Sequence, residues 1–566
     1  MARLTLQERL EFTAIEAERA RRGLIARALN SPTLRWRYGT PRVDQLLIVP
    51  QDLRSADPSF WLEVRNDQFG LAGCIARLDG RSPFDIRPPN RNWSHALNGF
   101  GWLRHLAAAA ETEATDAARQ LAVEWIIRNA KGTGEAWRPD VLARRVISWL
   151  SHANLLLDDA DERTYHSIAT SLGYQLVRLS SAWREAPAGA PRLLALMALV
   201  YADLCVAGRD RRLEVDQPML IDEFRRQILP DGGHVSRNPS ALVEILLDLL
   251  PLRQCFRARG RKQPAQLDDV ATSMLDMLRF LRLGDGLLAR FNGVSVGMPA
   301  RLSTVMAYAD PIGSINRHAR SSGYERLQQG DTILVADVGA PPPVVLAGAS
   351  HAGCLSFELS CDTEILFSNA GAPGSAHADW ASAARATANH NTLVLGETSS
   401  SRLIGTRRIE QLLGSLPIRG PAMLSVEGIG PAEGQVGFAA SHNGYVERYG
   451  LVHARRIVME NDGRRIVGTD ELKPPGGIMR LKRDLPYAIH FHLHPGVTCR
   501  RGDKVGTVFI DAGEQRWRMA AEGARIVIEE SKYFADATGP VRRLQIVLRG
   551  ATYGESEVRW AISRQA

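Results

Sequence analysis

Three histidines lie close together between Val344 and Ser401, in a segment with the alternating polar and apolar residues of β-strands. His351 and His390 each stand at one of two such strand runs, and His377 lies in the turn-rich stretch between them. Imidazoles on neighbouring strands can meet over one face of a sheet, where they can move protons or bind a metal ion. We therefore place the centre of a catalytic or binding site in this segment.

A second set of polar residues stands in one loop, DGGHVSRNP, from Asp231 to Pro239. If this loop faces the histidine segment, the two together supply a base, a cation that can hold a carboxylate, and an acid. The candidate catalytic residues are His234, His351, His390 and Arg385. The candidate substrate-binding residues are Arg237 and Asn238, with Trp93 and His95 from the loop NRNWSH.

The same residues also have structural interpretations, which stay open. His234 follows two glycines and can simply order its loop or cap the next helix, and Asn238 before Pro239 is a suitable helix N-cap. His390 can be a buried histidine whose ring is satisfied by main-chain carbonyls. Most tryptophans in helices belong to the core, so only Trp93, in a loop, is a candidate platform for a sugar ring.

Three further histidines, His490, His492 and His494, alternate along one expected strand and so point to one side of it. This spacing resembles a metal-binding triad. Because Phe491 and Leu493 fill the other face, we prefer to interpret the histidine side as a solvent-facing or inter-domain face.

Length and composition indicate an ordinary globular protein of two domains. The chain has 566 residues, which is more than one hydrophobic core usually supports, and 45% of them are apolar. Seventy Lys and Arg against 62 Asp and Glu give a net charge of +8, which favours an anionic partner. The basic residues are scattered and form no nucleic-acid motif, so an acidic polysaccharide or oligosaccharide is preferred to a nucleic acid.

The cysteines and the N-terminus bear on the compartment. The six cysteines form no CxxC pair, which argues against a disulfide framework or a cysteine zinc site. Charges interrupt the first 30 residues, so they do not resemble a signal peptide, and the most apolar run, Leu193 to Val206, is too short to cross a bilayer. We expect a bacterial cytoplasmic protein without a transmembrane segment, with a periplasmic location as the alternative.

The first half of the chain is predicted to be helical. Apolar residues recur at helical spacing over residues 5–30, 102–129, 139–157, 162–183, 192–207, 217–228, 241–249 and 267–283. Ile168, Leu172, Leu176 and Leu179 form one such buried stripe. Many helices of similar length with short connections predict hairpins packed side by side, either in an α/α toroid or in an α-solenoid; no fixed-period repeat supports the solenoid.

After a loop-rich segment at residues 284–323, period-two alternation predicts strands to the end of the chain. Expected strands include 332–337, 355–359, 365–367, 392–395, 445–453, 455–460, 464–469, 488–493, 505–510, 525–530 and 545–548. Their number and spacing predict a large antiparallel β-sandwich. We therefore expect an α+β protein with an α/α toroid at residues 1–325 and a β-sandwich at residues 326–566.

Several segments carry a family resemblance: DGGHVSRNP, HAGCLSFELS from His351, SNAGAP from Ser368, ARATANHNTLVL from Ala384, and SHNGYVERYGLVHARRIV from Ser441. With them the chain resembles the heparinase II/III-like polysaccharide lyases over nearly its whole length. The resemblance implies a toroid, a β-sandwich and a cleft for an acidic glycan.

The resemblance also implies that family site positions are substituted in this chain. Ala241 stands where a tyrosine base is expected, and Ala349 where the first, catalytic histidine of an HxH pattern is expected. The implied zinc ligands correspond to His351, Asn369 and His390, of which the asparagine is a poor zinc ligand. We therefore expect no certain cofactor, and we disfavour zinc.

Two functions follow as hypotheses. The first is a lyase that cleaves a uronate-containing, glycosaminoglycan-like polymer by β-elimination, with a base from the histidine set. The second is a catalytically degenerate protein that binds glycan or serves polysaccharide biogenesis. Family membership favours the first hypothesis, and Ala241 and Ala349 favour the second.

Overall fold

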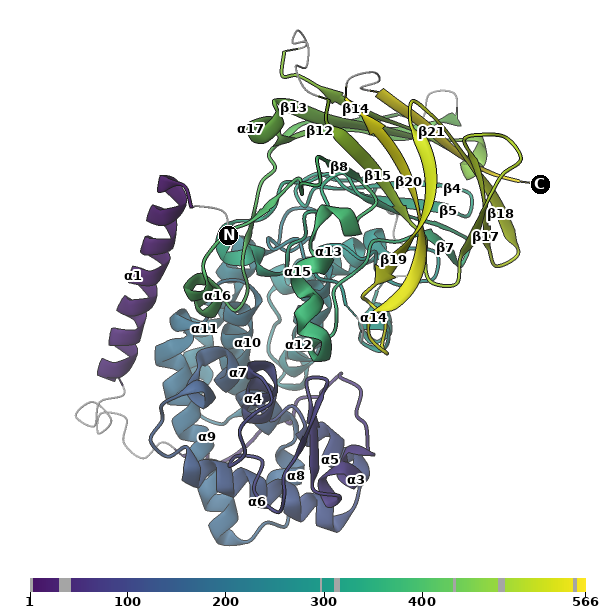
Figure 1. The fold of residues 1–566 in the computed structure, drawn as a ribbon. Coiled ribbons are helices and arrows are strands. Elements are labelled where there is room, and N and C mark those ends of the chain that lie inside the picture. Colours follow the sequence, from purple (N-terminus) through teal and green to yellow (C-terminus); the bar gives the residue numbers. More distant parts are fainter. Residues whose placement is uncertain are drawn as a thin grey trace. The chain divides into compact units, whose positions relative to one another are not determined.

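The computed structural model describes residues 4–29, 42–295, 298–309, 316–430, 434–476, 484–552 and 557–565. Helices fill most of the N-terminal half and strands most of the C-terminal half (Figure 1). Residue contacts divide the chain into two compact units. The helical unit consists of Thr5–Gln227 and Val243–Thr272, and the sandwich unit mainly of Ile228–Leu242 and Ser273–Ala566. The loop with His234 therefore belongs to the sandwich unit; the domain boundary near residue 325 stays a prediction.

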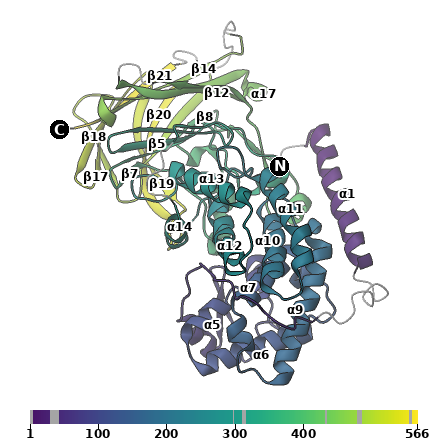
Figure 2. The ribbon, with the colours of Figure 1, turned by 180° about the vertical axis from the view of Figure 1, so that it is seen from behind.

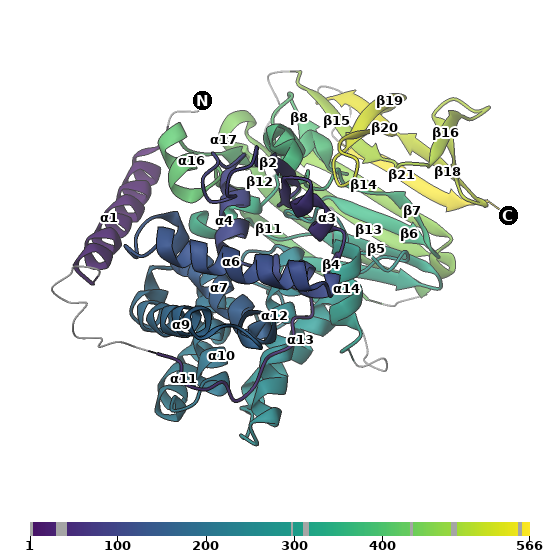
Figure 3. The ribbon, with the colours of Figure 1, turned by 90° about the horizontal axis from the view of Figure 1, so that it is seen from below.

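The predicted helical N-terminal half is confirmed. Its helices are α1 (Leu6–Leu29), α3 (Phe60–Arg65), α4 (Arg91–Gly99), α5 (Leu103–Ala109), α6 (Thr112–Arg128), α7 (Pro139–Ser151), α8 (Ala153–Leu157), α9 (Glu162–Ala182), α10 (Ala190–Cys205), α11 (Asp210–Gln227), α12 (Pro239–Ala258) and α13 (Ala265–Leu281). Helix α10 contacts α7, α9 and α11, and Figure 3 shows these helices side by side. The strands β1 (Gln68–Leu71) and β2 (Cys74–Arg77) form a small hairpin in this unit.

Local chemistry explains the helix ends. Asp161 caps α9 by accepting hydrogen bonds from the N–H groups of Arg163 and Thr164. The predicted helix over residues 102–129 is two helices, because Ala110 adopts a left-handed backbone (φ 55°) and ends α5. No helix among the described residues is long and apolar enough to span a bilayer.

The predicted antiparallel sheets of the C-terminal half are also confirmed. The five-stranded sheet runs in the order β3 (His318–Ala319), β4 (Tyr324–Gln329), β5 (Thr332–Asp337), β6 (Phe357–Cys361) and β7 (Glu364–Phe367). The four-stranded sheet runs in the order β19 (Arg525–Tyr533), β20 (Val541–Ala551), β15 (Pro486–His492) and β8 (Leu393–Leu395). The eight-stranded sheet runs in the order β11 (Met423–Ile429), β12 (Val436–Tyr445), β13 (Leu451–Glu460), β14 (Arg465–Lys473), β21 (Glu557–Arg564), β18 (Gln515–Glu522), β17 (Thr507–Ala512) and β16 (Thr498–Arg501). Figure 2 shows β14 beside β21, where the sheet joins distant parts of the sequence.

Smaller elements connect these sheets: α14 (Met298–Met306), α15 (Ala381–Ala384), α16 (Arg407–Leu413), α17 (Val446–Tyr449), and the strand pair β9 (Arg402–Leu403) and β10 (Ile418–Arg419). The strand predicted over residues 445–453 is confirmed only at its ends, because β12 ends at Tyr445, α17 occupies Val446–Tyr449 and β13 begins at Leu451. Gly450 ends α17 with a left-handed backbone (φ 72°). All six cysteines are free thiols.

A buried polar network joins the eight-stranded sheet to the histidine segment. Asp470 of β14 accepts hydrogen bonds from Arg455 Nε (2.8 Å) and Trp560 Nε1 (2.9 Å), and its Oδ1 lies 2.7 Å from His453 Nε2. Arg455 Nη1 donates at 2.7 Å to the carbonyls of Leu355 and Asn391, four residues after His351 and one after His390. Both side chains of the Arg455–Asp470 pair are fully buried, so this pair fixes the main chain beside the histidines.

We predict that Asp470→Ala lowers the free energy of unfolding of the sandwich unit by about 3–5 kcal/mol, because it leaves the Arg455 charge buried without a partner. Urea unfolding measures this change. The matched control is Asp511→Ala, which removes the largely exposed pair with Arg516 and should cost at most about 1 kcal/mol. Equal losses of unfolding free energy in the two variants would contradict the stabilising role of the Arg455–Asp470 pair.

Candidate functional site

Arg237 holds the 231–239 loop against the five-stranded sheet. Its Nε donates to the carbonyl of Ser322 (2.7 Å), and its Nη atoms donate to Asp337 Oδ1 (2.5 Å) and to three further carbonyls. Those carbonyls belong to Gly323, Gly339 and Ala340, each at 3.0 Å. All five N–H groups of the guanidinium are thus engaged inside the protein. Arg237, predicted to bind substrate, has none left for a ligand.

Asn292 extends this network to His351. Its Nδ2 donates to Tyr324 Oη (2.8 Å) and to Asp337 Oδ2 (3.1 Å), and its Oδ1 accepts the main-chain N–H of His351 (3.1 Å). Tyr324 in turn donates to the carbonyl of Arg237 (2.7 Å). The loop and the histidine segment are therefore fixed to each other within the sandwich unit, as the sequence hypothesis required.

His234 is 3% exposed and turns Nδ1 back onto its own loop. The main-chain N–H of Ser236 donates to Nδ1 (3.1 Å), and Ser236 Oγ lies 2.7 Å from the same atom. The proton of a neutral ring therefore sits on Nε2. Burial lowers the pKa of His234 to about 4, so the ring is neutral at neutral pH.

His351 and His390 form a hydrogen-bonded pair. His351 Nδ1 lies 3.0 Å from His390 Nε2, and His390 Nδ1 lies 2.8 Å from the carbonyl of Ala386. A carbonyl can only accept, so His390 carries its proton on Nδ1 and His351 donates from its own Nδ1. The unused lone pair of this hydrogen-bonded series is on His351 Nε2, which has no hydrogen-bond partner among the described residues.

Burial keeps both imidazoles of this pair uncharged. His351 is 6% exposed and His390 1% exposed. Desolvation, with the neighbouring His390 adding to it, holds the pKa of His351 well below its usual range, and desolvation lowers the pKa of His390 to about 4. His351 Nε2 is therefore a neutral base in a fixed orientation.

Arg385, predicted to be catalytic, ties the segment before His351 together. Its guanidinium donates to the carbonyls of Ser350 (2.7 Å), Leu416 (2.7 Å) and Ala347 (3.1 Å). Burial lowers its pKa to about 10, and only 7% of the residue is exposed. The contacts give Arg385 a structural role.

Asn238 brings a free amide donor close to Ala349. A methyl group on Gly293 would lie 3.0 Å from Ala349 Cβ and 3.1 Å from Asn238 Nδ2, so both side chains pack closely against Gly293. Asn238 Oδ1 caps α12 by accepting from the N–H of Ser240 (2.9 Å), whereas Nδ2 has no partner among the described residues. We call Asn238, Gly293, Ala349 and His351 the loop–sheet patch.

Zinc does not fit the implied ligand set. Asn369 Oδ1 already accepts the main-chain N–H of Asn391 (2.9 Å), so the implied set of His351, Asn369 and His390 lacks a third strong ligand. Among the described residues, no group of three His, Cys, Asp or Glu has the arrangement of a metal site.

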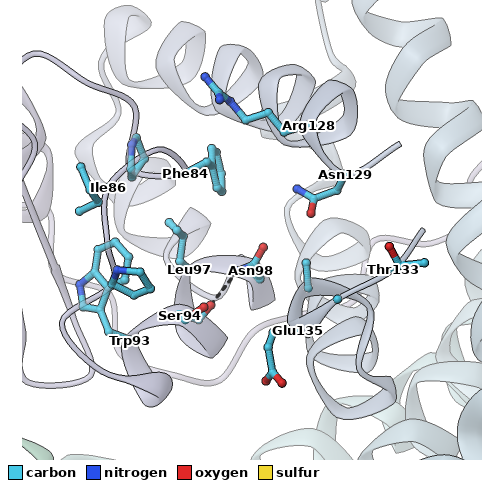
Figure 4. Close-up of a pocket in the computed structure, with 14 residues that line it drawn as sticks. Phe84, Ile86, Trp93, Ser94, Leu97, Asn98, Arg128, Asn129, Thr133 and Glu135 are labelled. Carbon is cyan, nitrogen blue, oxygen red and sulfur yellow. Dashed lines mark hydrogen bonds between the residues drawn. The ribbon is translucent and has the colours of Figure 1, made fainter. Parts of the chain in front are cut away.

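Trp93 and His95 lie in the helical unit, on α4. The Trp93 indole is 1% exposed and donates to the carbonyl of Phe69 (3.1 Å), so it offers no open face to a sugar ring. It forms part of the inner wall of a pocket of about 500 Å³ that Phe84, Leu97, Arg128 and Glu135 also line (Figure 4). His95 Nε2 lies 2.9 Å from Glu135 Oε2 and borders a second pocket of about 360 Å³.

The alternating histidines of β15 are buried, contrary to a solvent-facing interpretation. His490 Nδ1 lies 3.0 Å from Gln545 Oε1, and His492 contacts Ser531 Oγ (2.8 Å) and the carbonyl of Ala388 (2.9 Å). Side chains of β19 and β20 in the same sheet, with the carbonyl of Ala388, thus satisfy the two rings. Sequence reasoning also missed Asn292, Asp337 and Tyr324, whose spacing along the chain carries no signal of their contacts.

Residues 312–561 match the family model of the heparinase II/III-like C-terminal domain. The C-terminal part of the chain is therefore similar to the heparinase II/III-like C-terminal domain. A crystal structure of heparinase III matches with a TM-score of 0.68 and 13% identity over 95% of this chain and 89% of that one. Heparan sulfate lyase HepC from Pedobacter heparinus matches with a TM-score of 0.58 and 14% identity over 95% and 88%. These likenesses confirm a heparinase III-like fold.

A curated relative of similar length is FtsZ-localized protein C from Caulobacter vibrioides. It is 29% identical to this chain in an alignment of 566 positions that covers 98% of this chain and 96% of that protein. The match therefore covers both units of the structure.

We predict that His234→Gln flattens the loss of stability in acid. The folded-state pKa of about 4 lies below the usual 6.5, so the unfolded chain takes up the proton first and stability falls between these two pH values. The variant should reduce that slope by at most about 1.4 kcal/mol per pH unit. Urea unfolding from pH 7 downward measures the slope, and His166→Gln, at an exposed position of α9, is the control. An unchanged slope in His234→Gln would contradict the prediction.

Proposed function

We propose that this heparinase II/III-like protein binds an acidic, uronate-containing glycan without cleaving it, and that it does so where FtsZ is located. The proposal depends mainly on one observation, that the guanidinium groups of Arg237 and Arg385 are directed at oxygens of the protein itself. β-Elimination needs a cation or strong donors on the uronate carboxylate, because the proton beside it must be made acidic. Neither arginine is placed to serve that purpose.

The proton-transfer groups support the same proposal. Ala241 and Ala349 carry methyl groups at the positions where the family resemblance implies a tyrosine base and a histidine. His390 uses both ring nitrogens inside the protein, and His234 directs Nδ1 to Ser236. A general acid that could protonate the leaving oxygen is thus missing from the predicted set.

Binding of an acidic glycan is supported by the chemistry that remains. Asn238 Nδ2 is an available donor in the loop–sheet patch, and an amide can hold a carboxylate without moving a proton. The net charge of +8 attracts a polyanion over a distance. The relative that is 29% identical is an FtsZ-localized protein, which supports the location.

The test combines cleavage and binding on one panel of uronate polymers, such as heparan sulfate, hyaluronan, alginate and polygalacturonate. We expect calorimetric binding of at least one polymer and no ultraviolet absorbance from an unsaturated uronate product. Asn238→Ala should weaken that binding about tenfold, the value of one hydrogen bond to a charged group. Asn66→Ala, whose amide donates to Leu62 within α3, is the control and should bind normally. Absence of binding to every polymer would overturn the proposal.

A lyase is the second candidate, because His351 Nε2 is a neutral, oriented base without a hydrogen-bond partner among the described residues. In that case the wild type forms unsaturated product, and His351→Ala lowers the rate by about 100-fold or more. Product formed equally by His351→Ala would exclude this base. A fluorescent fusion that does not coincide with labelled FtsZ would overturn only the proposed location.

A further inference from the structure

Helix α1, purple in Figure 1, carries a heptad pattern on its solvent side. Six positions are spaced alternately four and three residues apart, which is the spacing of a coiled-coil seam. They are Leu6, Leu10, Thr13, Ala17, Ala20 and Leu24, and all six are exposed. The three leucines are 75%, 65% and 64% exposed. Among the described residues, nothing covers this stripe.

The opposite side of α1 is the buried one, although it is the more polar. Glu8 is fully buried and Phe12 is 4% exposed, while Glu11, Ile15 and Arg22 are partly buried. A helix that only covers a globular unit turns its leucines inward and its charges outward. In α1 the leucines face outward and charged side chains face inward. Another helix can therefore pack on the leucine stripe while Phe12 keeps its contacts.

We propose that the leucine stripe is the seam of a parallel two-stranded coiled coil between the α1 helices of two copies of this chain. In a heptad register with Leu10, Ala17 and Leu24 at positions a, and Leu6, Thr13 and Ala20 at positions d, each residue meets its own counterpart. The alanines in the middle allow the two backbones to approach closely, and the leucines pack at both ends.

Charge complementarity favours a second copy of α1 as the partner, in the parallel orientation. Glu16 occupies position g and Arg21 the following position e, so a parallel pair brings Glu16 of one copy beside Arg21 of the other. Within α1 the Arg21 guanidinium binds Glu18 through Nε and Nη2 (2.7 Å each), and Glu16 of the other copy would share it. An antiparallel pair would set the two Glu16 carboxylates opposite each other. Arg9 and Ala14, the preceding g and e residues, add no repulsion. The inference is independent of the proposed glycan function.

Sedimentation or light scattering on the full chain tests the contact. A seam of this length with three leucines is short, so the dimer should be weak, with the measured mass rising from 62.3 kDa towards twice that value as concentration increases. Leu10→Asp/Leu24→Asp should remain monomeric at every concentration. Leu62→Asp changes a leucine of α3 that is 54% exposed and should still dimerise. Circular dichroism shows whether the double variant retains its helices. A monomeric wild type, or a dimer unaffected by the folded double variant, would overturn the proposal.

Charge exchange tests the direction. Glu16→Arg should weaken the dimer about threefold, and Glu16→Arg/Arg21→Glu should restore it, because the ion pairs re-form with opposite sign. In addition, Ala17→Cys should give a disulfide-linked dimer under oxidation, since position a meets position a only in the parallel arrangement. A stronger dimer with Glu16→Ala, which removes the repulsion between the two Glu16 carboxylates of an antiparallel pair, would indicate the antiparallel arrangement and refute this one.

Discussion

The arrangement of the candidate site depends on one guanidinium group. Arg237 lies in a connection that precedes α12, yet its five N–H groups bind oxygens supplied by residues 322–340. Gly339 permits this, since a Cβ there would stand 2.5 Å from Arg237 Cζ. Asp337 provides the only negative charge in the set and also binds Asn292, which holds the main chain of His351. A change at Arg237 would therefore move both sides of the loop–sheet patch.

A second buried charge pair stabilises the other side of the same segment. Arg455 and Asp470 lie on adjacent strands of the eight-stranded sheet, and Arg455 reaches the carbonyls of Leu355 and Asn391. The histidine pair is thus held between two arginine–aspartate pairs on different sheets. Such rigidity suits a surface that recognises a shape. This anchoring of the main chain also explains why arginine, which contributes most of the positive charge of the chain, is so often buried in the protein.

The elements were predictable from sequence where a repeating pattern specifies them. Helical spacing identified α9 with its stripe from Ile168 to Leu179, and alternation identified strands such as β5 and β15. The break at Ala110 was missed because the left-handed conformation of an alanine has no signature in composition. The roles of Arg237 and Arg385 were missed for another reason. Residue type and spacing indicate that a guanidinium is present, but its acceptors are main-chain carbonyls, which every residue has.

The path of the chain between the two units has a consequence for synthesis. Residues 228–242 join the sandwich unit, but residues 243–272 return to the helical unit. As the chain leaves the ribosome, the helical unit can be completed once residue 272 has emerged. The loop with Arg237 must then wait for another 65 residues, from 272 to 337, before Asp337 is available, and domains generally fold as units in the order of synthesis. During that interval the loop is anchored at both ends to a finished helical unit, and Arg237 lacks the acceptors that residues 322–340 supply. The connectivity therefore determines the order of folding. A gene fragment that ends between the two units would leave Arg237 of this loop permanently without Asp337.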